Sequence, residues 1–210
     1  MKNRLFIDFD GTIFETKKFE KTFFETLIKA GISESELRTA YQLECLTYRF
    51  SLNSLVYKLH EKINFNLKLT MARLDSHYLK IPGNFIYPDV VSFLQGIDRS
   101  KFSVELLTLG DPEFQKKKIK LSNILPYFDK TYYTTEQKWN WLKNEVKSNE
   151  RFVIIDDRGD TIYEIGKIYK NALALEINRS DLQSDPMEPR KRYANIVVRN
   201  LKQAGMYLQS

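Results

Sequence analysis

The sequence predicts an α/β fold in which a Rossmann-like parallel sheet core carries an inserted all-helical segment. Two observations lead to this prediction. Beyond residue 88, short apolar runs alternate with amphipathic helical patterns, and such alternation is typical of a parallel sheet covered by helices on both faces. Between the first apolar run and residue 80, only helical patterns occur. We therefore expect a core formed by residues 1–14 and 81–210, and a helical insertion formed by residues 15–80.

One strand and four helices are expected in the first 80 residues. Residues 4–9 contain the apolar run LFI, which is typical of a strand buried on both faces. Apolar residues then recur at helical spacing as far as Gly31, which ends the first helix. Ser33 and Glu36 form a capping box for a second helix that extends to about Arg49. Further helical patterns cover residues 52–63 and 66–79.

The second part of the chain begins at Pro82-Gly83, its clearest break in regular structure. We expect this break and the segment Phe14–Thr16 to be the hinges of the insertion. The expected strands are residues 102–109, 130–134, 152–156, 172–177 and 195–198. The expected helices are residues 88–97, 112–124, 136–148, 160–170 and 200–208.

The composition is that of a globular protein. The chain has 210 residues, of which 42% are hydrophobic, so it can form a sizeable core. Its one cysteine, Cys45, cannot form an intrachain disulfide, which fits a reducing compartment. The first apolar run is too short for a signal peptide or a membrane span. We therefore expect a soluble cytoplasmic protein.

The charge suggests few classes of partner. The net charge is +6, from 33 basic and 27 acidic residues, and such an excess is typical of a solvated surface. A nucleic-acid partner, suggested by this charge and by the basic run at residues 188–193, is less favoured. His60 and His77 have no further His or Cys near them in the sequence, so no metal role is expected for them. No oligomeric state is indicated.

Polar residues follow the expected strands at the points where these strands end. Since ligands of open parallel sheets bind beyond the carboxyl ends of the strands, these residues are expected to meet. Taken alone, each group except the first is better explained by a turn, a helix cap or an ordinary strand or surface residue. Together, in this order, they indicate a site. In chain order they are Asp8 and Asp10; Thr108, Gly110 and Asp111; Lys138; and Asp156, Asp157 and Asp160.

Four of these segments resemble the signatures of the haloacid dehalogenase superfamily. FIDFDGTI resembles the first signature and LLTLG the second, while Lys138 resembles the third and VIIDDRGD the acidic fourth. Their order and spacing match across nearly the whole chain. The insertion at residues 15–80 lies where this superfamily has its helical cap. The resemblance implies a phosphatase-type hydrolase with an α-helical cap.

The resemblance also implies roles for the first two aspartates. Asp8 would be the nucleophile that forms an aspartyl-phosphate, and Asp10 would be the general acid and base. Side chains two residues apart on an extended segment point the same way, so both can reach one phosphoryl group. Dehalogenases of the superfamily lack an aspartate at the second position and its ATPases have threonine there. Asp10 therefore indicates a phosphatase or a phosphomutase.

The remaining signature residues would bind the phosphate and a Mg²⁺ ion. Thr108 and Lys138 would act in catalysis by holding the phosphoryl oxygens. The expected phosphate-binding residues are Gly11, Thr12, Thr108, Leu109, Gly110 and Lys138. The expected metal ligands are Asp8, Asp10, Asp156 and Asp157, because Mg²⁺ prefers oxygen ligands.

Two assignments stay open at this point. Asp160 has the spacing from Asp156 that is frequent in the fourth signature, so it competes with Asp157 as a metal ligand. Lys143 is the reserve for Lys138. The run Lys116–Lys118 is set aside, because it follows the second signature too closely and is expected on the wrong side of a helix and a strand.

The expected function is Mg²⁺-dependent hydrolysis of a small phosphorylated metabolite through an aspartyl-phosphate. The alternatives are a phosphomutase of the same superfamily, a phosphatase for nucleic-acid ends, and a non-catalytic scaffold. The expected cap contains no motif, so the sequence does not indicate the substrate.

Overall fold

A parallel sheet forms the centre of the larger half of the molecule. The computed structural model describes residues 2–47, 49–78, 85–179 and 196–209. Within these ranges six strands lie in the order β3-β2-β1-β4-β5-β6, and each neighbouring pair is parallel. This confirms the predicted Rossmann-like α/β core. The strands are β1 (Asn3–Ile7), β2 (Phe102–Leu109), β3 (Lys130–Thr134), β4 (Phe152–Asp156), β5 (Leu173–Ile177) and β6 (Ile196–Val198).

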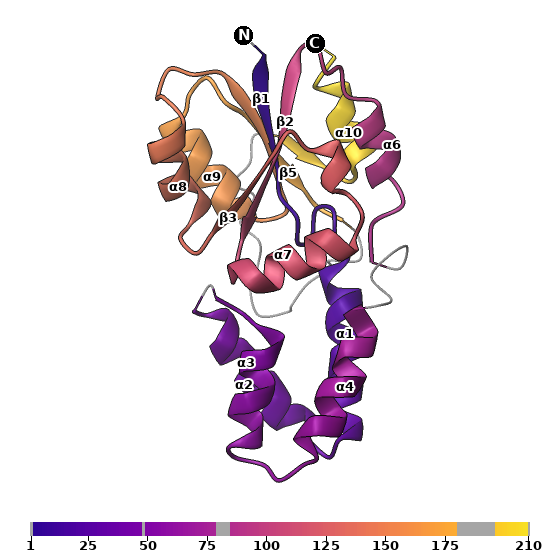
Figure 1. The fold of residues 1–210 in the computed structure, drawn as a ribbon. Coiled ribbons are helices and arrows are strands. Elements are labelled where there is room, and N and C mark those ends of the chain that lie inside the picture. Colours follow the sequence, from indigo (N-terminus) through magenta and orange to yellow (C-terminus); the bar gives the residue numbers. More distant parts are fainter. Residues whose placement is uncertain (1, 48, 79–84, 180–195, 210) are drawn as a thin grey trace.

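Helices cover both faces of this sheet (Figure 1). On one face lie α8 (Lys138–Glu145) and α9 (Gly159–Ile168), and on the other lie α6 (Val90–Gln95) and α10 (Leu201–Met206). Along β1 the buried side chains alternate between two apolar clusters, Phe6 in one and Leu5 and Ile7 in the other. Helix α7 (Pro112–Leu121) and a short 3-10 helix (Leu125–Tyr127) connect β2 to β3.

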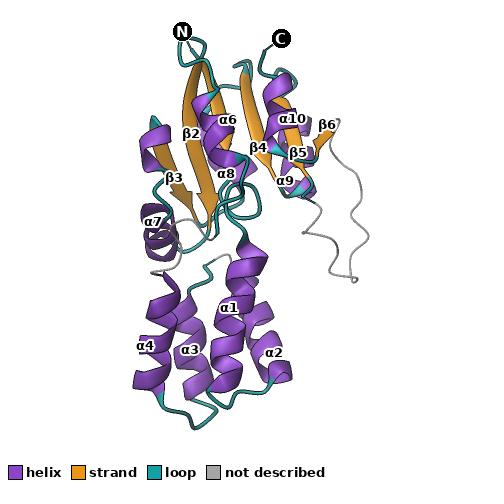
Figure 2. Cartoon of the chain, turned by 90° about the vertical axis from the view of Figure 1, so that its right-hand side faces the viewer, coloured by secondary structure: helices purple, strands orange, loops and turns teal. Residues whose placement is uncertain are grey.

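Within the described ranges, four helices form a separate block beyond the carboxyl ends of the strands (Figure 2). They are α1 (Thr16–Lys29), α2 (Glu34–Cys45), α3 (Leu52–His60) and α4 (Leu67–Tyr78). The expected capping box of Ser33 and Glu36 begins α2. None of the helices in the described ranges is long and apolar enough to cross a membrane.

Helix α2 is shorter than its pattern predicts. It ends at Cys45 and does not continue to Arg49. The Thr47 hydroxyl donates to the Glu44 carbonyl at 2.7 Å and accepts from the Arg49 N–H at 3.1 Å. These bonds replace those of a further helical turn, because a Thr side chain competes with the backbone for such partners.

The junction between the sheet and the helical block is packed with aromatic rings. Phe14 is fully buried, and its ring centroid lies 5.0 Å from that of Phe9, 5.5 Å from Phe19 and 5.9 Å from Phe85. One apolar cluster therefore runs from the sheet into the helices. Of the two expected hinges, Phe14–Thr16 lies at this junction, whereas Pro82-Gly83 lies outside the described residues, as does the basic run at residues 188–193.

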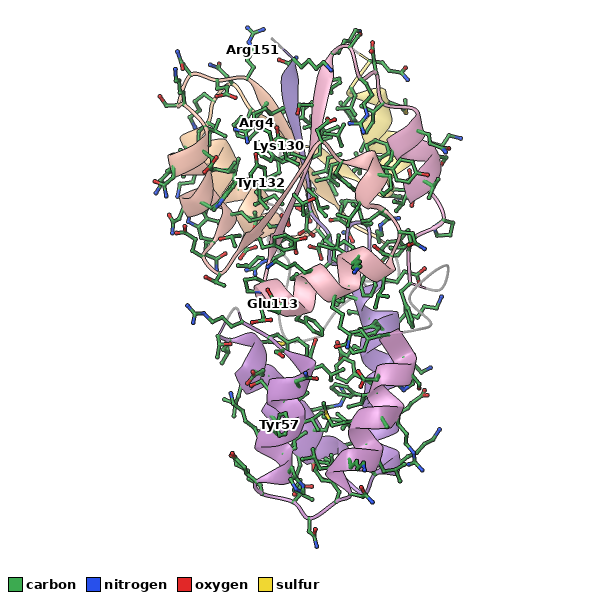
Figure 3. The ribbon with its side chains drawn as sticks, in the orientation of Figure 1. Arg4, Tyr57, Glu113, Lys130, Tyr132 and Arg151 are labelled. Atoms are coloured by element: carbon green, nitrogen blue, oxygen red, sulfur yellow. The ribbon has the colours of Figure 1, made fainter. Side chains whose placement is uncertain are left out.

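A buried ion pair connects β1 and β2 in the part of the sheet that lies away from the helical block. Away from the helical block, the buried Glu105 carboxylate accepts two hydrogen bonds from Arg4, at 2.7 and 3.0 Å, and Arg4 also contacts the Tyr132 hydroxyl (Figure 3). Glu113 of α7, by contrast, lies at the junction with the helical block, which contains Tyr57 (Figure 3). The Arg4–Glu105 pair is thus a structural contact away from the helical block.

Candidate active site

Three strand ends meet at the edge of the sheet that faces the helical block. Because β1 lies between β2 and β4, the residues that end these strands are neighbours. Asp8 continues β1, and its N–H donates to the Ile155 carbonyl at 2.9 Å. Thr108 lies near the end of β2, and Asp156 is the last residue of β4. The parallel register thus gathers Asp8, Thr108 and Asp156, which are far apart in the sequence.

A buried lysine connects two of these acids. Lys138 is the first residue of α8 and only 3% exposed. Its Nζ donates to Asp8 Oδ1 and, at 2.6 Å, to Asp156 Oδ2. The reserve lysine, Lys143, is exposed and donates to Asn140 Oδ1. Of these two lysines, the one that contacts the acids is Lys138.

A third carboxylate completes an acidic cluster with this lysine. One carboxylate oxygen from each of Asp8, Asp156 and Asp157 lies within 4.8 Å of the others. Burial raises the pKa of Asp8 to about 7, against the opposing effect of Lys138. Burial and the charges of Asp8 and Asp156 raise the pKa of Asp157 well above its ordinary value. When all three carboxyls are ionised, the Lys138 ammonium balances one of their charges, and a hard cation would balance the other two.

Asp160 lies outside this cluster. Arg158 donates to both of its carboxylate oxygens, at 2.6 and 3.1 Å, and the Asp160 side chain is 50% exposed. His77 is hydrogen-bonded to Thr26, and the His60 ring packs edge-on against Phe65. Among the described residues, the three-aspartate cluster is therefore the one group of His, Cys, Asp or Glu side chains that is close enough to hold a metal ion.

Asp10 has a different environment from Asp8. Its carboxylate accepts hydrogen bonds from Lys118 at 2.5 Å, Gln115 at 2.7 Å and Thr16 at 2.9 Å. Burial alone would raise the pKa of Asp10, but the Lys118 ammonium and these hydrogen bonds outweigh it and lower the pKa below its usual value. The structure therefore holds Asp10 as a carboxylate that is separate from the three-aspartate cluster.

Lys118 lies beside Asp10, although the sequence analysis sets its lysine run aside as candidates for the phosphate-binding lysine. It is only 3% exposed, and its ammonium lies 4.8–5.3 Å from the ring centroids of Phe9, Phe14 and Phe114. Helix α7 begins at Pro112, so Gln115 and Lys118, three residues apart, share one face. That helical phase was a signal that could have identified both residues.

The turn after Asp8 requires glycine. Gly11 has φ +77°, and a Cβ atom at this position would lie 2.2 Å from Asp157 Oδ2. Its N–H donates to the Phe14 carbonyl at 2.9 Å and contacts Thr16 Oγ1 at 3.1 Å. Glycine is needed here for its backbone conformation and because the acidic cluster approaches the chain so closely.

Two threonine hydroxyls beside the acids are buried without a partner among the described residues. They are Thr12 Oγ1 and Thr108 Oγ1, and both residues are fully buried. An unpaired buried hydroxyl costs about 1–3 kcal/mol, so these two sites favour a polar ligand. The Leu109 carbonyl and the Gly110 N–H, in contrast, are already hydrogen-bonded within the fold.

Arg179, which the sequence analysis does not identify, stabilises the turn that follows Asp8. The Arg179 guanidinium, which is 6% exposed, donates twice to the Thr12 carbonyl, at 2.7 and 3.1 Å. It also donates to Asp89 at 2.9 Å and lies over the Tyr87 ring. Because its partners lie 90 and 167 residues away, no local pattern marks Arg179.

Comparisons with known proteins agree with this arrangement. A family model described as haloacid dehalogenase-like hydrolase matches residues 3–152. A comparison with curated proteins gives no match.

Solved structures share the fold along the whole chain. The HAD phosphatase from Thermococcus onnurineus is 23% identical, with 99% of this chain and 98% of that chain covered and a TM-score of 0.63. The HAD-hydrolase YfnB from Bacillus subtilis bound to magnesium is 13% identical, with 100% and 99% covered and a TM-score of 0.68. A dehalogenase with an intermediate complex is 18% identical, with 100% and 98% covered and a TM-score of 0.67.

At these identities the structures establish the fold and leave the reaction open, since a phosphatase and a dehalogenase share it. The family model, however, spans well over half of the chain. Its match is the finding that assigns the family: the chain belongs to the haloacid dehalogenase-like hydrolases.

Proposed function

We propose that the protein is a Mg²⁺-dependent phosphatase that hydrolyses the phosphate monoester of a small molecule through an aspartyl-phosphate on Asp8. The observation that carries the proposal is the contrast between Asp8 and Asp10. The first lies in an acidic cluster with Lys138, whereas Lys118 and Gln115 hold the second apart from it. Two carboxylates in such different environments suit two different roles.

The first half of the reaction transfers the phosphoryl group to the protein. An Asp8 carboxylate oxygen attacks phosphorus, the bond from phosphorus to the ester oxygen breaks, and Asp10 gives the departing alcohol a proton that it has first taken up from water, in the second half of the preceding turnover. Lys138 and the hydroxyl of Thr108 hold the phosphoryl oxygens, on which negative charge must be stabilised. The unpaired hydroxyl of Thr108 supports this role.

The second half releases phosphate. Asp10 takes a proton from a water molecule, the water oxygen attacks phosphorus, and the bond between phosphorus and Asp8 breaks. Lys118 stabilises the carboxylate form of Asp10, which is the form that accepts this proton. The same contact opposes the protonation of Asp10, which must precede the first half of the reaction. We therefore expect esters with good leaving groups to react faster, since their departure needs less protonation.

The three-aspartate cluster fits Mg²⁺. Asp8, Asp156 and Asp157 offer converging carboxylate oxygens, and the single ammonium of Lys138 leaves their charge unbalanced. These residues would hold the ion, which when bound offsets the repulsion between a carboxylate and a phosphate. The magnesium in the Bacillus subtilis structure supports the same choice of metal.

Metal removal tests the proposed function. EDTA is expected to abolish hydrolysis of 4-nitrophenyl phosphate by the purified protein, and added Mg²⁺ is expected to restore it, with phosphate and alcohol released in equal amounts. Halide release from 2-chloropropionate, measured in parallel, is expected to be absent. Full activity in the metal-free protein, or halide release without phosphatase activity, would contradict the proposal.

A pair of carboxylate-to-amide substitutions tests the metal ligands. Asp157→Asn is expected to raise the Mg²⁺ concentration for half-maximal activity by at least about tenfold, because it removes a charged oxygen from the cluster. Asp160→Asn makes the same chemical change on an acid bound by Arg158, and it is expected to leave the Mg²⁺ requirement unchanged. The opposite pattern would assign the metal to Asp160.

We further propose that residues 15–80 act as a cap over a catalytic core of residues 1–14 and 81–210. The position of α1–α4 beyond the carboxyl ends of the strands supports this role (Figures 1 and 2). A cap would exclude water and select the leaving group. Substitution of a cap residue beside the site should alter leaving-group selectivity and leave the Mg²⁺ requirement unchanged. A variant that changes only the Mg²⁺ requirement would count against this role.

A further inference from the structure

A cavity lies between the helical block and α7, directly beside Asp10. Its volume is about 210 Å³, and its lining includes Asp10, Gly110 and Gln115 from the core side. Because Asp10 would protonate the departing alcohol, the alcohol part of the substrate must lie within reach of Asp10. This cavity is therefore on the leaving-group side of the site.

Aromatic rings form most of the apolar wall. Phe50 lies between the helical block and the core: its ring centroid is 5.2 Å from that of Tyr41, 6.2 Å from Phe23 and 5.3 Å from Phe114. These four rings and that of Phe19 line the cavity. Rings at such separations favour offset or edge-on contacts with a further planar ring.

Most polar groups that line the cavity already have partners. Thr16 and Lys118 are bound to Asp10, and Arg158 is bound to Asp160. Burial, together with the neighbouring Glu20 and Cys45, raises the pKa of the Tyr41 hydroxyl, so these three polar groups lie close to one another. A ligand with many hydroxyl groups would have to displace these contacts or bury its hydroxyls against rings, which is unfavourable.

Among the described residues that line the cavity, one buried side-chain oxygen has no hydrogen-bond partner. Gln115 is 4% exposed, and its Nε2 donates to Asp10 Oδ2 at 2.7 Å and to the Leu109 carbonyl at 3.1 Å. Both partners are acceptors, so they fix the orientation of the amide. Gln115 Oε1 is consequently a buried acceptor with no donor among the described residues.

We propose that this cavity binds the alcohol part of the substrate, and that this alcohol carries a planar aromatic ring with an N–H or O–H donor directed at Gln115 Oε1. The assignment deepens the proposed phosphatase function and rests on it. The substrates are thus aromatic phosphomonoesters, and sugar and polyol phosphates are poor substrates.

A set of primary phosphate esters tests the ring. The esters share similar leaving oxygens, so kcat/KM reports the binding of the remaining group. Benzyl phosphate is expected to exceed cyclohexylmethyl phosphate by about two- to tenfold, which is the effect of ring-on-ring contact. It is expected to exceed glycerol phosphate by at least about tenfold, because the glycerol hydroxyls lack partners.

A second pair of esters tests the donor. In the phosphate ester of 3-methoxybenzyl alcohol, a methyl group replaces the hydroxyl hydrogen of the 3-hydroxybenzyl ester, so the donor is removed. The hydroxyl compound is expected to have a kcat/KM at least about fivefold higher, because it satisfies the buried acceptor. The assignment of the cavity would be overturned if kcat/KM were the same for benzyl and cyclohexylmethyl phosphate and also the same for the hydroxyl and methoxyl esters.

A substitution in the helical block, with a matched control, tests whether the preference for aromatic esters arises in this cavity. Phe50→Leu keeps an apolar side chain in the cavity and removes one of its five rings, so it is expected to lower the ratio of kcat/KM for benzyl phosphate to that for cyclohexylmethyl phosphate. Phe128→Leu makes the same change on a half-buried ring outside the cavity lining and is expected to keep the wild-type ratio. A ratio that Phe50→Leu leaves unchanged would contradict the assignment.

Binding separates this inference from the proposed function. Calorimetry with the Asp8→Asn protein and Mg²⁺ measures the affinity for the same esters without turnover. Tighter binding of the aromatic esters with no hydrolysis by wild type would sustain the cavity assignment and overturn the phosphatase. Hydrolysis without aromatic preference in either measurement would sustain the phosphatase and overturn the cavity assignment. Neither binding nor hydrolysis of any ester would overturn both.

Discussion

Substitution of Lys138 by methionine is expected to lower kcat for phosphate monoester hydrolysis by at least about 100-fold. Methionine keeps the buried aliphatic stem and removes the ammonium that contacts Asp8 and Asp156. The phosphoryl oxygens then lose a positive charge at the stage when their own negative charge must be stabilised. Steady-state hydrolysis of 4-nitrophenyl phosphate at saturating Mg²⁺ measures this loss.

The same substitution is expected to destabilise the metal-free protein. Two buried carboxylates lose their shared cation, and removal of one partner from a buried ion pair costs about 3–5 kcal/mol. Mg²⁺ should therefore raise the thermal midpoint of the Lys138→Met variant more than that of wild type, whereas kcat stays low. Stability and activity then respond differently to the metal, which a purely structural role of Lys138 would not produce.

Lys143→Met is the matched control, because it makes the same chemical change on an exposed residue of α8. Its kcat is expected to stay within about twofold of wild type, as is usual for surface substitutions away from special contacts. If Lys143→Met lost activity and Lys138→Met kept it, the phosphate-binding lysine would have been assigned to the wrong residue.

The sheet and the acidic cluster were predictable from the sequence because they depend on short-range patterns. The strands β1 and β4 contain local apolar runs, and an aspartate directly follows each run, as Asp8 follows LFI and Asp156 follows VII. A parallel sheet then brings strand ends together whatever the chain does between them. The acidic cluster could therefore be predicted although its residues are far apart in the sequence.

Unlike the acidic cluster, Lys118 and Arg179 were not predicted from short-range sequence patterns. Lys118 shares a lysine run with Lys116, and the helical phase of α7 places the two residues on different faces, but the burial of one face against three aromatic rings is a tertiary contact. Arg179 acts on a carbonyl that any residue could supply, so its partner has no sequence signature. Both roles depend on tertiary contacts, which single-residue patterns do not encode.

The predicted residues and the missed residues also differ in their proposed roles. The residues that were predicted are those proposed to touch the phosphate or the metal, where the reaction limits the choice of side chain. The residues that were missed hold Asp10 and the Thr12 carbonyl in place, and several kinds of side chain could do so. Sequence patterns are thus more informative about the reacting groups than about their supports.

Asp8→Asn and Asp10→Asn are expected to stop turnover at different steps. Asp8→Asn removes the nucleophile, so no phosphoprotein should form with any ester. In Asp10→Asn the nucleophile remains, and 4-nitrophenyl phosphate has a leaving group that barely needs a proton. Asp8 can therefore still be phosphorylated, but a neutral amide cannot take a proton from water for the second step. The aspartyl-phosphate should accumulate in this variant.

Mass spectrometry of protein quenched rapidly with acid measures this difference as a mass increase of one phosphoryl group. The increase is expected in Asp10→Asn and absent in Asp8→Asn, and Asp160→Asn, which makes the same chemical change outside the cluster, should turn over normally. The amide oxygen at position 10 can still accept from Lys118, and the thermal midpoint checks that the variant is folded. If both variants were folded, equally inactive and free of phosphoryl groups while wild type hydrolysed the same ester, the roles of Asp8 and Asp10 would be wrong. Accumulation in Asp10→Asn alone would show that these two carboxylates, two residues apart, act in consecutive steps of one reaction.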